Sequence, residues 1–308
     1  AGFYDEQAIV PVAAAADEYR QQSGQSLDIP AGDDLLALLP PDGTAHREVA
    51  RLAAWTEPHR ETVFTNSGLP IPAVKLLVPI PRPNKMFFLA GNYAQHIEEG
   101  GGIAAERAET FPYVFMKPPS TTLTDPGQPV RIPSLSPEHI DWELELAVVI
   151  GRLAKGVPAS EALDYVAGYT VVNDISDRRF RPNPNRKMRD RDRFFDWLHG
   201  KWHDSFCPCG PCILSADAVA DPQQFELRLS VNGEVKQHAS TALQIFPVAA
   251  VIEFIATFVT LEPGDIIATG TPAGVGDARG EKLKNGDQIE ASIASIGTLV
   301  SVVESAAT

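Results

Sequence analysis

Short apolar or alternating runs, each bounded by Gly, Pro, Asn or Asp, recur through the chain after residue 85. Runs of this length and punctuation are typical of β-strands, because helices need longer periodic segments. We expect strands at residues 86–89, 113–116, 144–150, 168–172, 225–231, 265–269, 288–293 and 298–303, with helices between them at 160–166 and 247–259. Many strands with so few helices disfavour alternating βαβ units and predict an α+β fold dominated by β-structure.

A proline-rich segment separates this strand-rich part from the residues before it. Pro79, Pro81 and Pro83 favour extended backbone over residues 79–85, which predicts a linker. We therefore expect a small N-terminal domain at residues 1–78 and a larger domain at residues 79–308. Within the smaller one, residues 12–22 and 33–39 have helical patterns that end near prolines.

The composition excludes several classes of protein. Of the 308 residues, 44% are hydrophobic and 21% are charged, as in globular rather than disordered proteins. Asp and Glu outnumber Lys and Arg by 40 to 26, and the net charge of −14 argues against nucleic acid or an anionic membrane as the partner. We expect a cytoplasmic protein, because no apolar run is long enough to span a bilayer, no secretory signal is visible and there are 3 cysteines.

Two carboxylates interrupt one of the apolar predicted strands. On a strand, Glu143 and Glu145 point to one face while Leu144 points to the other. Asp174 ends a second apolar run, and three carboxylates at the ends of buried strands would form a hard oxygen site suited to Mg²⁺ or Mn²⁺. A Glu-x-Glu pattern alone is more often the solvated face of an edge strand, so that alternative stays open.

His96 and Glu99 form a second candidate pair. On one helical turn they would share a face, within reach of an imidazole–carboxylate hydrogen bond. A carboxylate beside histidine raises the basicity of the ring and fixes its tautomer, as a water-activating base requires. Taken alone, an incidental pair on a surface helix is the simpler interpretation.

The order of these motifs along the chain resembles the fumarylacetoacetate hydrolase family. The resemblance covers about residues 80–305. Each motif is modest alone, but together they follow the family's order at similar spacing. The motifs are Gly91-Asn92-Tyr93, His96-x-x-Glu99, Lys117-Pro118, Glu143-x-Glu145, Asp174, Gly200-Lys201, residues 232–237 (NGEVKQ) and residues 264–276 (GDIIATGTPAGVG).

The resemblance implies a mixed β-roll catalytic domain, usually homodimeric. It also implies one divalent cation, most often Mg²⁺, with Mn²⁺ or Ca²⁺ as alternatives. By position, Glu143, Glu145 and Asp174 match the family's metal ligands. Asn92 stands where the true fumarylacetoacetases have an aspartate ligand, so the chain is more similar to the shorter, acylpyruvase-like members.

The same resemblance implies roles for further side chains. His96 and Glu99 match a dyad that activates water on a lid over the substrate, and Lys201 matches a lysine near the scissile carbonyl. Arg178 matches a contact with a substrate carboxylate. Other predicted polar contacts with the substrate come from Lys117, Gln237 and Thr271.

These assignments predict a metal-dependent hydrolase that cleaves a C–C bond in a 1,3-diketo acid of the acylpyruvate kind, whose partner is a small 2-oxo acid. Decarboxylation, isomerisation or dehydration of a 2-oxo acid through the same enolate is the alternative, because a shared fold does not fix the reaction. The His96–Glu99 pair favours hydrolysis, since isomerisation needs no activated water. A binding protein without activity is disfavoured, because it would be expected to lack part of this set.

One segment departs from the family pattern. Residues 178–193 contain seven Arg and one Lys against two Asp, a local net charge of +6, where typical members are shorter. Pro182 and Pro184 disfavour helix there, and residues 194–198 (FFDWL) follow as an apolar anchor. The segment would extend the lid toward a dicarboxylic substrate, form a dimer contact with the acidic surface, or be a solvated loop.

The cysteines invite a metal interpretation. Cys207, Cys209 and Cys212 are closely spaced, and His199 or His203 could complete a zinc site. Free cysteines are more often small buried hydrophobic side chains, and we expect that role here.

Overall fold

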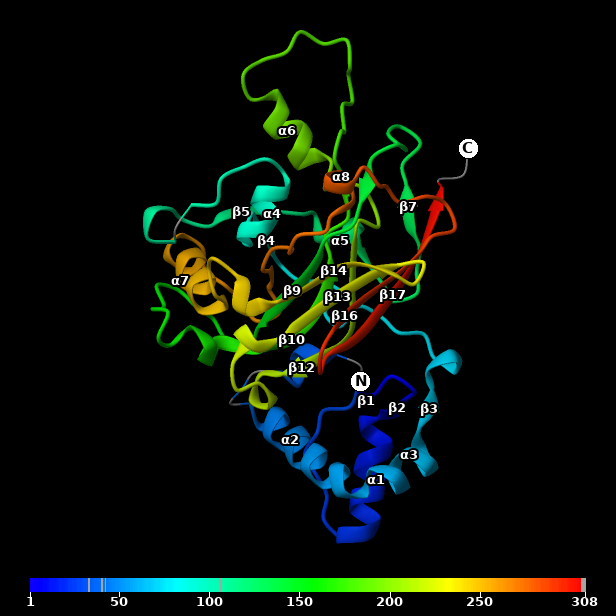
Figure 1. The fold of residues 1–308 in the computed structure, drawn as a ribbon. Helices are drawn as coiled ribbons and strands as arrows, with labels where there is room; N and C mark the ends of the chain where they lie inside the picture. Colours follow the sequence, from blue (N-terminus) through cyan, green and yellow to red (C-terminus); the bar gives the residue numbers. More distant parts are fainter. Residues whose placement is uncertain (33, 40, 42, 106, 306–308) are drawn as a thin grey trace.

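Two β-sheets form the larger part of the protein (Figure 1). The structure is a computed structural model that describes residues 1–32, 34–39, 41, 43–105 and 107–305. The seven-stranded sheet, in the order β5-β4-β15-β9-β10-β12-β6, contains β4 (Met86–Ala90), β5 (Tyr113–Met116), β6 (Leu123–Thr124), β9 (Leu144–Ile150), β10 (Val166–Asn173), β12 (Cys207–Ser215) and β15 (Ile266–Ala268). The five-stranded sheet, in the order β14-β13-β16-β17-β7, contains β7 (Val130–Ile132), β13 (Glu226–Val231), β14 (Glu234–Ser240), β16 (Gln288–Ile293) and β17 (Gly297–Ser305).

The predicted fold class, α+β with a dominant mixed β-roll, is confirmed. Parallel pairs (β4–β15, β6–β12 and β7–β17) occur among antiparallel ones, and the sheets curl into a half-barrel around one large core. Every predicted strand is present to within two residues at each end. The predicted helix at residues 160–166 is wrong: Ala162–Tyr165 form one 3₁₀ turn, and Val166 already pairs with Ile150 in β10. This pairing places Val166 in the core, and such tertiary packing overrides a weak local preference.

β9 explains how two acidic residues come to lie inside the protein. Its alternate residues from Leu144 to Ile150 join the large core, while Ala147 and Val149 join a second cluster on the opposite face of the sheet. Glu143 and Glu145 share the face of Ala147 because side chains alternate along a strand. Both faces of β9 are covered, so the carboxylates are buried and the solvated edge-strand alternative is wrong.

The N-terminal residues form a smaller layer with its own hydrophobic cluster. Strands β1 (Gly2–Tyr4), β2 (Ala8–Pro11) and β3 (Leu69–Pro70) pair beside α1 (Val12–Ser23), α2 (Thr44–Thr56) and α3 (Arg60–Ser67). The helix predicted at residues 12–22 is confirmed. Over 33–39 the described residues contain only a 3₁₀ turn at Leu35–Ala37, and residue 33 lies outside them. Residues 79–85 have no helix or strand, but Ile80 is buried; the domain boundary there stays a prediction.

Further helices and one short strand pair connect the strands of the seven-stranded and five-stranded sheets. They are α4 (Ala94–Glu99), α5 (Pro119–Thr122), α6 (Asp192–His199), α7 (Val248–Phe258), α8 (Gly276–Arg279) and the pair β8 (Ile140–Asp141) and β11 (Ser176–Asp177). Pro247 is the N-cap of α7, as its predicted start requires. The longest described helix, α2, has 13 residues, and the described part of the chain offers no helix with the length and apolarity of a membrane span.

Candidate active site

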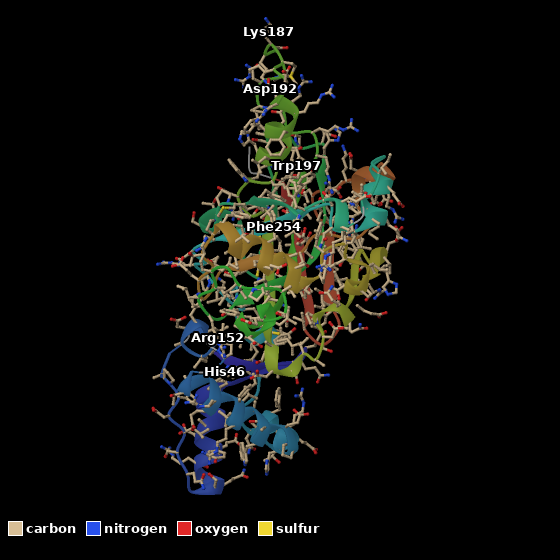
Figure 2. All side chains as sticks on the ribbon, turned by 90° about the vertical axis from the view of Figure 1, so that its left-hand side faces the viewer. His46, Arg152, Lys187, Asp192, Trp197 and Phe254 are labelled. Atoms are coloured by element: carbon tan, nitrogen blue, oxygen red, sulfur yellow. The ribbon has the colours of Figure 1, made fainter. Side chains whose placement is uncertain are left out.

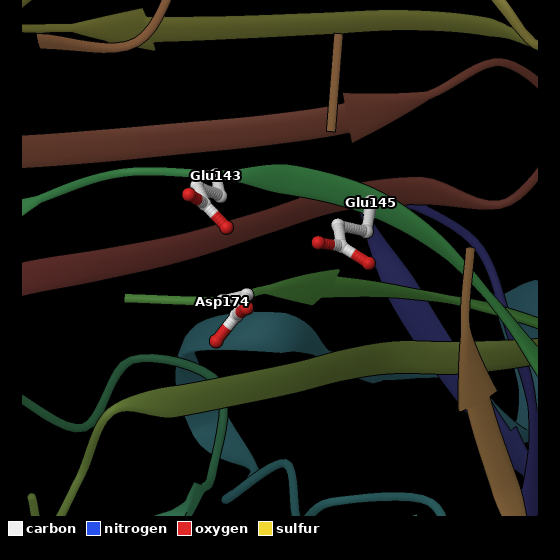
Figure 3. A group of neighbouring side chains, drawn as sticks. All are labelled: Glu143, Glu145 and Asp174. Atoms are coloured by element: carbon white, nitrogen blue, oxygen red, sulfur yellow. The ribbon is translucent and has the colours of Figure 1, made fainter. Parts of the chain in front are cut away.

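Three buried carboxylates meet where β9 and β10 pair (Figure 3). Antiparallel register places Glu145 opposite Val172, and the hydrogen bond from Asp174 N to Glu143 O (2.8 Å) extends the pairing beyond the strand. Glu143, Glu145 and Asp174 each offer a carboxylate oxygen, and these oxygens lie within 4.8 Å of one another. The structure thus brings together the three residues that the sequence suggested as metal ligands.

Cationic side chains hold two of these carboxylates. Lys201 Nζ lies 2.8 Å from Glu143 Oε2 and 2.6 Å from Asp174 Oδ2. Arg178 Nη1 lies 2.6 Å from Glu143 Oε1, and Lys117 Nζ lies 2.6 Å from Asp174 Oδ1. Burial alone would raise the pKa of Glu143, but the charges of Arg178 and Lys201 outweigh it and hold that pKa below its usual range. Glu143 is therefore ionised at neutral pH.

Glu145 has the opposite electrostatic environment. Burial, followed by the charges of Asp174 and Glu143, raises its pKa well above the usual value for glutamate. Its Oε2 accepts a hydrogen bond from Gly270 N (2.7 Å), but its Oε1 is buried without a partner among the described residues. A buried acceptor left open beside two other carboxylates is a position where a cation would be stabilised.

The cluster passes the chemical test for a divalent cation. All three donors are hard carboxylate oxygens, the type that Mg²⁺ and Mn²⁺ prefer. The ion pairs of Glu143 and Asp174 leave acceptor capacity, because each carboxylate oxygen has two lone pairs. Glu143, Glu145 and Asp174 can therefore hold one such ion.

The His96–Glu99 pair exists and is anchored. Both residues lie in α4, and His96 Nδ1 is 2.8 Å from Glu99 Oε1. Glu99 Oε2 accepts a second hydrogen bond from Gly274 N (2.8 Å), which fixes the carboxylate from the loop after β15. An Nδ1–H bonded to a carboxylate leaves Nε2 as the ring nitrogen that can accept a proton.

A cavity of about 230 Å³ connects these groups. One part of its lining is charged or polar and comes from His96, Glu143, Arg178, Lys201 and Thr271. The rest is apolar or backbone and comes from Leu89, Ala90, Gly91, Phe115 and Trp197. His96 of the dyad, Glu143 of the carboxylate cluster and the two cations therefore face one small space.

Arg178 presents an unused donor at this cavity. Its Nε donates to Asp141 Oδ2 (2.7 Å), and its Nη1 is paired with Glu143. Its Nη2 is buried and has no partner among the described residues. A buried guanidinium with a free N–H is suited to a carboxylate ligand, which fits the predicted role of Arg178.

Two other predicted substrate contacts are bonded inside the protein. The Lys117 ammonium donates to Asp174 and to the carbonyl oxygens of Ile175 and Phe206, so its three donors are all used. Gln237 Oε1 accepts from the backbone N–H of residue 144, and its Nε2 donates to Thr271 Oγ1 and to a backbone carbonyl (each 2.8 Å). These bonds indicate that Lys117 positions Asp174 and that Gln237 positions the loop after β15. Neither side chain has a free donor left for the substrate. Thr271 itself lines the cavity.

Asn92 also has an internal role. Its amide donates to the carbonyl oxygens of Phe246 (3.0 Å) and Thr269 (2.8 Å), and its Oδ1 accepts from Phe246 N (2.8 Å). Asn92 thereby ties β4 to the start of α7 and to the loop after β15. This bonding fits the absence of an aspartate ligand at this position.

Sequence reasoning missed four residues of the site. Asp141 orients Arg178, Ser176 Oγ accepts from Lys201 Nζ (2.8 Å), and Phe115 and Trp197 form the aromatic part of the cavity lining. Two signals were available: Asp141 is two residues before Glu143, and Trp197 is one helical turn before Lys201. Neither signal identifies a partner without the fold.

The Arg-rich segment and the cysteines lie outside this constellation. Arg186 pairs with Asp192 (3.1 Å) and Asp196, and Arg189 pairs with Asp192 (2.9 Å), so these charges hold the segment onto α6. Among the described residues, the cavity lining includes Arg178 and no other arginine of residues 178–193. Burial raises the pKa of the Cys209 thiol to about 12, which agrees with an inert thiol. Cys207 is buried as well, whereas Cys212 is only partly buried.

Known proteins share this sequence and fold. The chain is 39% identical over 237 residues to the mitochondrial oxaloacetate tautomerase FAHD2A of Bos taurus, covering 76% of this chain and 71% of that protein. Among solved structures, 5-carboxymethyl-2-hydroxymuconate delta-isomerase from Mycobacterium smegmatis is 36% identical, with a TM-score of 0.64 over 78% of this chain and 86% of that one. Maleylpyruvate hydrolase from Sphingobium sp. SYK-6, in complex with manganese (II) ion and pyruvate, is 26% identical, with a TM-score of 0.69 over 99% and 95%.

A family model gives the clearest match. Residues 85–304 match the model described as fumarylacetoacetate (FAA) hydrolase C-terminal. This span contains the three buried carboxylates, the His96–Glu99 pair and both sheets, so the match covers the residues that form the site as well as the fold. The chain belongs to the fumarylacetoacetate hydrolase family of enzymes.

Proposed function

We propose that this protein is a divalent-metal-dependent hydrolase that cleaves a C–C bond in a 1,3-diketo acid of the acylpyruvate kind. The observation that carries the proposal is the anchored His96–Glu99 pair, whose His96 lines the same cavity as Lys201 and as Glu143 of the carboxylate cluster. A histidine held by a carboxylate is a suitable base for water. The positive charges of Arg178 and Lys201, which line the same cavity, would attract an anionic substrate.

Arg178 and Lys201 would bind and orient the substrate. The free Nη2 of Arg178 would donate a charge-assisted hydrogen bond to the carboxylate of the pyruvoyl end. The three N–H groups of Lys201 already donate to Glu143, Asp174 and Ser176. Lys201 would therefore act on the distal carbonyl through its positive charge at the cavity, which stabilises the negative charge that develops on oxygen. The cavity volume of about 230 Å³ restricts the substrate to a small molecule.

The dyad would activate the water. His96 Nε2 takes a proton from water, and Glu99 stabilises the imidazolium that forms. The hydroxyl adds to the distal carbonyl carbon, the C–C bond on its pyruvoyl side breaks, and the products are pyruvate and a carboxylic acid, which loses its proton to solvent. His96 returns its proton to the methylene carbon of the departing pyruvate, so that atoms and protons balance.

A cation bound by Glu143, Glu145 and Asp174 would supply Lewis-acid charge for the electrons that collect on the pyruvoyl end. We propose Mg²⁺ as the resident ion, with Mn²⁺ as the substitute. The manganese (II) ion and pyruvate in the maleylpyruvate hydrolase structure support both the ion type and the product.

Isomerisation or tautomerisation of a 2-oxo acid is the second candidate. The names of the bovine tautomerase and of the mycobacterial isomerase favour it, since both proteins are more similar in sequence than the hydrolase. Those reactions move a proton between carbon and oxygen and need no attack by water. The anchored His96–Glu99 pair favours hydrolysis over them for that reason, and the products formed test this choice.

The test is to incubate the protein with Mg²⁺ and a panel of acylpyruvates and oxaloacetate, measuring pyruvate, carbon dioxide and enol absorbance separately. We expect pyruvate from acylpyruvates, and a fall of about 10²- to 10⁴-fold in that rate for His96→Gln. His238→Gln, whose side chain is 62% exposed outside the cavity, is the matched control and should keep the wild-type rate.

Two outcomes would oppose the proposal. Enol–keto interconversion of oxaloacetate without cleavage of any acylpyruvate would establish the second candidate. Unchanged hydrolysis in His96→Gln would show that another group activates the water.

A further inference from the structure

The apolar part of the cavity lining depends on a helix to which the family resemblance assigned no role. Trp197 lies in α6, directly after the Arg-rich segment, and lines the cavity together with Phe115. The two rings meet edge to face, with centroids 5.1 Å apart and planes at 71°. Lys201 Nζ lies 5.1 Å from the centre of the Phe115 ring and 5.6 Å from that of Trp197. The aromatic pair therefore borders the ammonium group.

The orientation of a bound 2-oxo acid follows from the two halves of the lining. Its carboxylate belongs beside Arg178, which offers the free N–H, and close to Glu143 and the other carboxylates. Its distal group then extends past Lys201 toward Phe115 and Trp197. Aromatic side chains provide large, rigid contact surfaces for such a group.

Trp197 is held in place from both ends of α6. At the start of the helix, Arg186 bridges Asp192 and Asp196. At its end, Trp197 and Leu198 pack against the second hydrophobic cluster. Figure 2 shows Trp197 at the base of the projecting segment and Lys187 at its tip, so the segment meets the body of the protein at the cavity.

We infer that Trp197 is the residue that limits the size of the distal, acyl end of the substrate, so that the site selects 2-oxo acids with a short, compact distal group. This inference rests on the proposed substrate class. It assigns the Arg-rich segment an indirect task, which is to hold α6 and its indole ring against the cavity. The chain would thus distinguish substrates by the length of their distal group at Trp197, which lies in the helix that follows the Arg-rich segment.

The experiment compares Trp197→Ala and Trp197→Phe with wild type. The matched control is Phe195→Ala, which removes a 44%-exposed ring from the same helix that does not line the cavity. Acylpyruvates of increasing acyl length are the substrates. The ratio of kcat/KM for a long acyl chain to that for acetylpyruvate is the readout, and melting temperature reports folding.

We expect Trp197→Ala to raise this ratio about tenfold to hundredfold, since a pocket discriminates hydrophobic groups by such factors. Trp197→Phe should give a smaller change, and Phe195→Ala none. An unchanged ratio in Trp197→Ala, or an equal change in Phe195→Ala, would overturn the inference. If Trp197→Ala does not fold, the ratio for Trp197→Phe decides.

A binding measurement separates this inference from the proposed reaction. Calorimetry gives the Kd of pyruvate and of phenylpyruvate in the presence of Mg²⁺, with no need for turnover. A wild-type protein that cleaves no acylpyruvate while Trp197→Ala still shifts the Kd ratio toward phenylpyruvate would refute the hydrolase and support the role of Trp197. Normal cleavage of acylpyruvates by the wild type, together with an unshifted Kd ratio in Trp197→Ala, would support the hydrolase and refute the role of Trp197.

Discussion

Glu145 forms no ion pair with any described residue, whereas Glu143 and Asp174 are each held by two cations. Burial and the two neighbouring charges raise the pKa of Glu145, so the metal-free site retains a proton there at a pH where an exposed glutamate is ionised. A metal ligand must lose that proton. The metal and the proton therefore compete for one carboxylate.

This competition predicts that Mn²⁺ binding releases a proton and strengthens as pH rises. Below the raised pKa of Glu145, affinity should fall by up to about tenfold for each pH unit. Calorimetric titrations in two buffers with different ionisation enthalpies measure the released proton. Glu290 is an exposed glutamate away from the cluster, so Glu290→Gln should release as many protons on Mn²⁺ binding as the wild type. A pH-independent affinity would contradict the protonated state of Glu145.

Lys117 is predicted to stabilise the protein rather than to bind substrate. Replacing it by Met leaves Asp174 half-paired in the interior, and breaking a buried ion pair costs about 3–5 kcal/mol of unfolding free energy. Lys75→Met removes a 65%-exposed lysine paired with Asp125 and should cost less than about 1 kcal/mol. Urea unfolding of metal-free protein measures both. Equal losses in the two variants would refute the structural role.

Strand alternation places Glu143 and Glu145 on one face, but this pattern alone left a solvated edge strand as the simpler alternative. The family resemblance was what assigned both residues and Asp174 to one metal site, and the structure brings the three together. The sequence could not predict that Lys117 and Gln237 use their donors internally. Their acceptors are mostly backbone oxygens and side chains far away in the chain. Such pairing depends on the folded arrangement and leaves no local pattern.

At the scale of elements, the loop that follows β15 positions two parts of the site. Gly270 N holds Glu145 and Gly274 N holds Glu99. Gly270 has φ +90°, and a Cβ there would lie 2.7 Å from the Cβ of Asn92. The glycines of this segment therefore allow the backbone to approach both carboxylates closely.

Gly270→Ala is predicted to weaken Mn²⁺ binding by about 10- to 100-fold, the usual effect of losing a group that orients a ligand. Gly280→Ala is the matched control, because Gly280 also has positive φ (+68°) but has nothing within 4 Å of its added Cβ. Titration calorimetry compares the two. A similar loss of affinity in Gly280→Ala would mean that backbone strain, and not displacement of Glu145, is the cause.

Helices and strands could be predicted where the pattern of apolar residues in the sequence matches the residues that are buried in the folded protein. β9 and β16 have the predicted bounds because short apolar runs between turn residues have few other ways to be buried. α6 was not predicted from the sequence because charged residues and two prolines precede it. Its apolar face becomes evident only in the folded protein, where Trp197 and Leu198 pack against the second hydrophobic cluster. α2 and α3 were missed as well, since they bury few residues each.

At the scale of the whole molecule, one surface is unusually apolar. Phe111, Tyr113 and Phe258 are 58%, 65% and 58% exposed, and Phe254 joins them through ring contacts. Tyr113 lies in β5, which is the edge strand of the seven-stranded sheet. An exposed apolar patch beside an open strand edge is typical of an interface between protein chains.

We expect a homodimer in which a second copy covers this patch. Light scattering after size-exclusion chromatography should give twice the mass of one chain. Tyr113→Glu should shift the protein toward the monomer, because a charge would then be buried at the interface. His238→Glu, at an exposed position on β14, should remain dimeric. A wild-type monomer at all concentrations would contradict this expectation.

The central claim is that Glu143, Glu145 and Asp174 hold one divalent cation on which cleavage of a 2-oxo acid depends. The most direct test is to treat the protein with a chelator, add Mn²⁺ back in steps, and record bound Mn²⁺ and pyruvate formation from acetylpyruvate together. We predict that activity rises from near zero in proportion to bound metal and saturates at one Mn²⁺ per chain. Over the same range of Mn²⁺ concentration, Glu145→Gln should bind no Mn²⁺ and recover no activity. Full activity of the chelator-treated protein in metal-free buffer would contradict the claim.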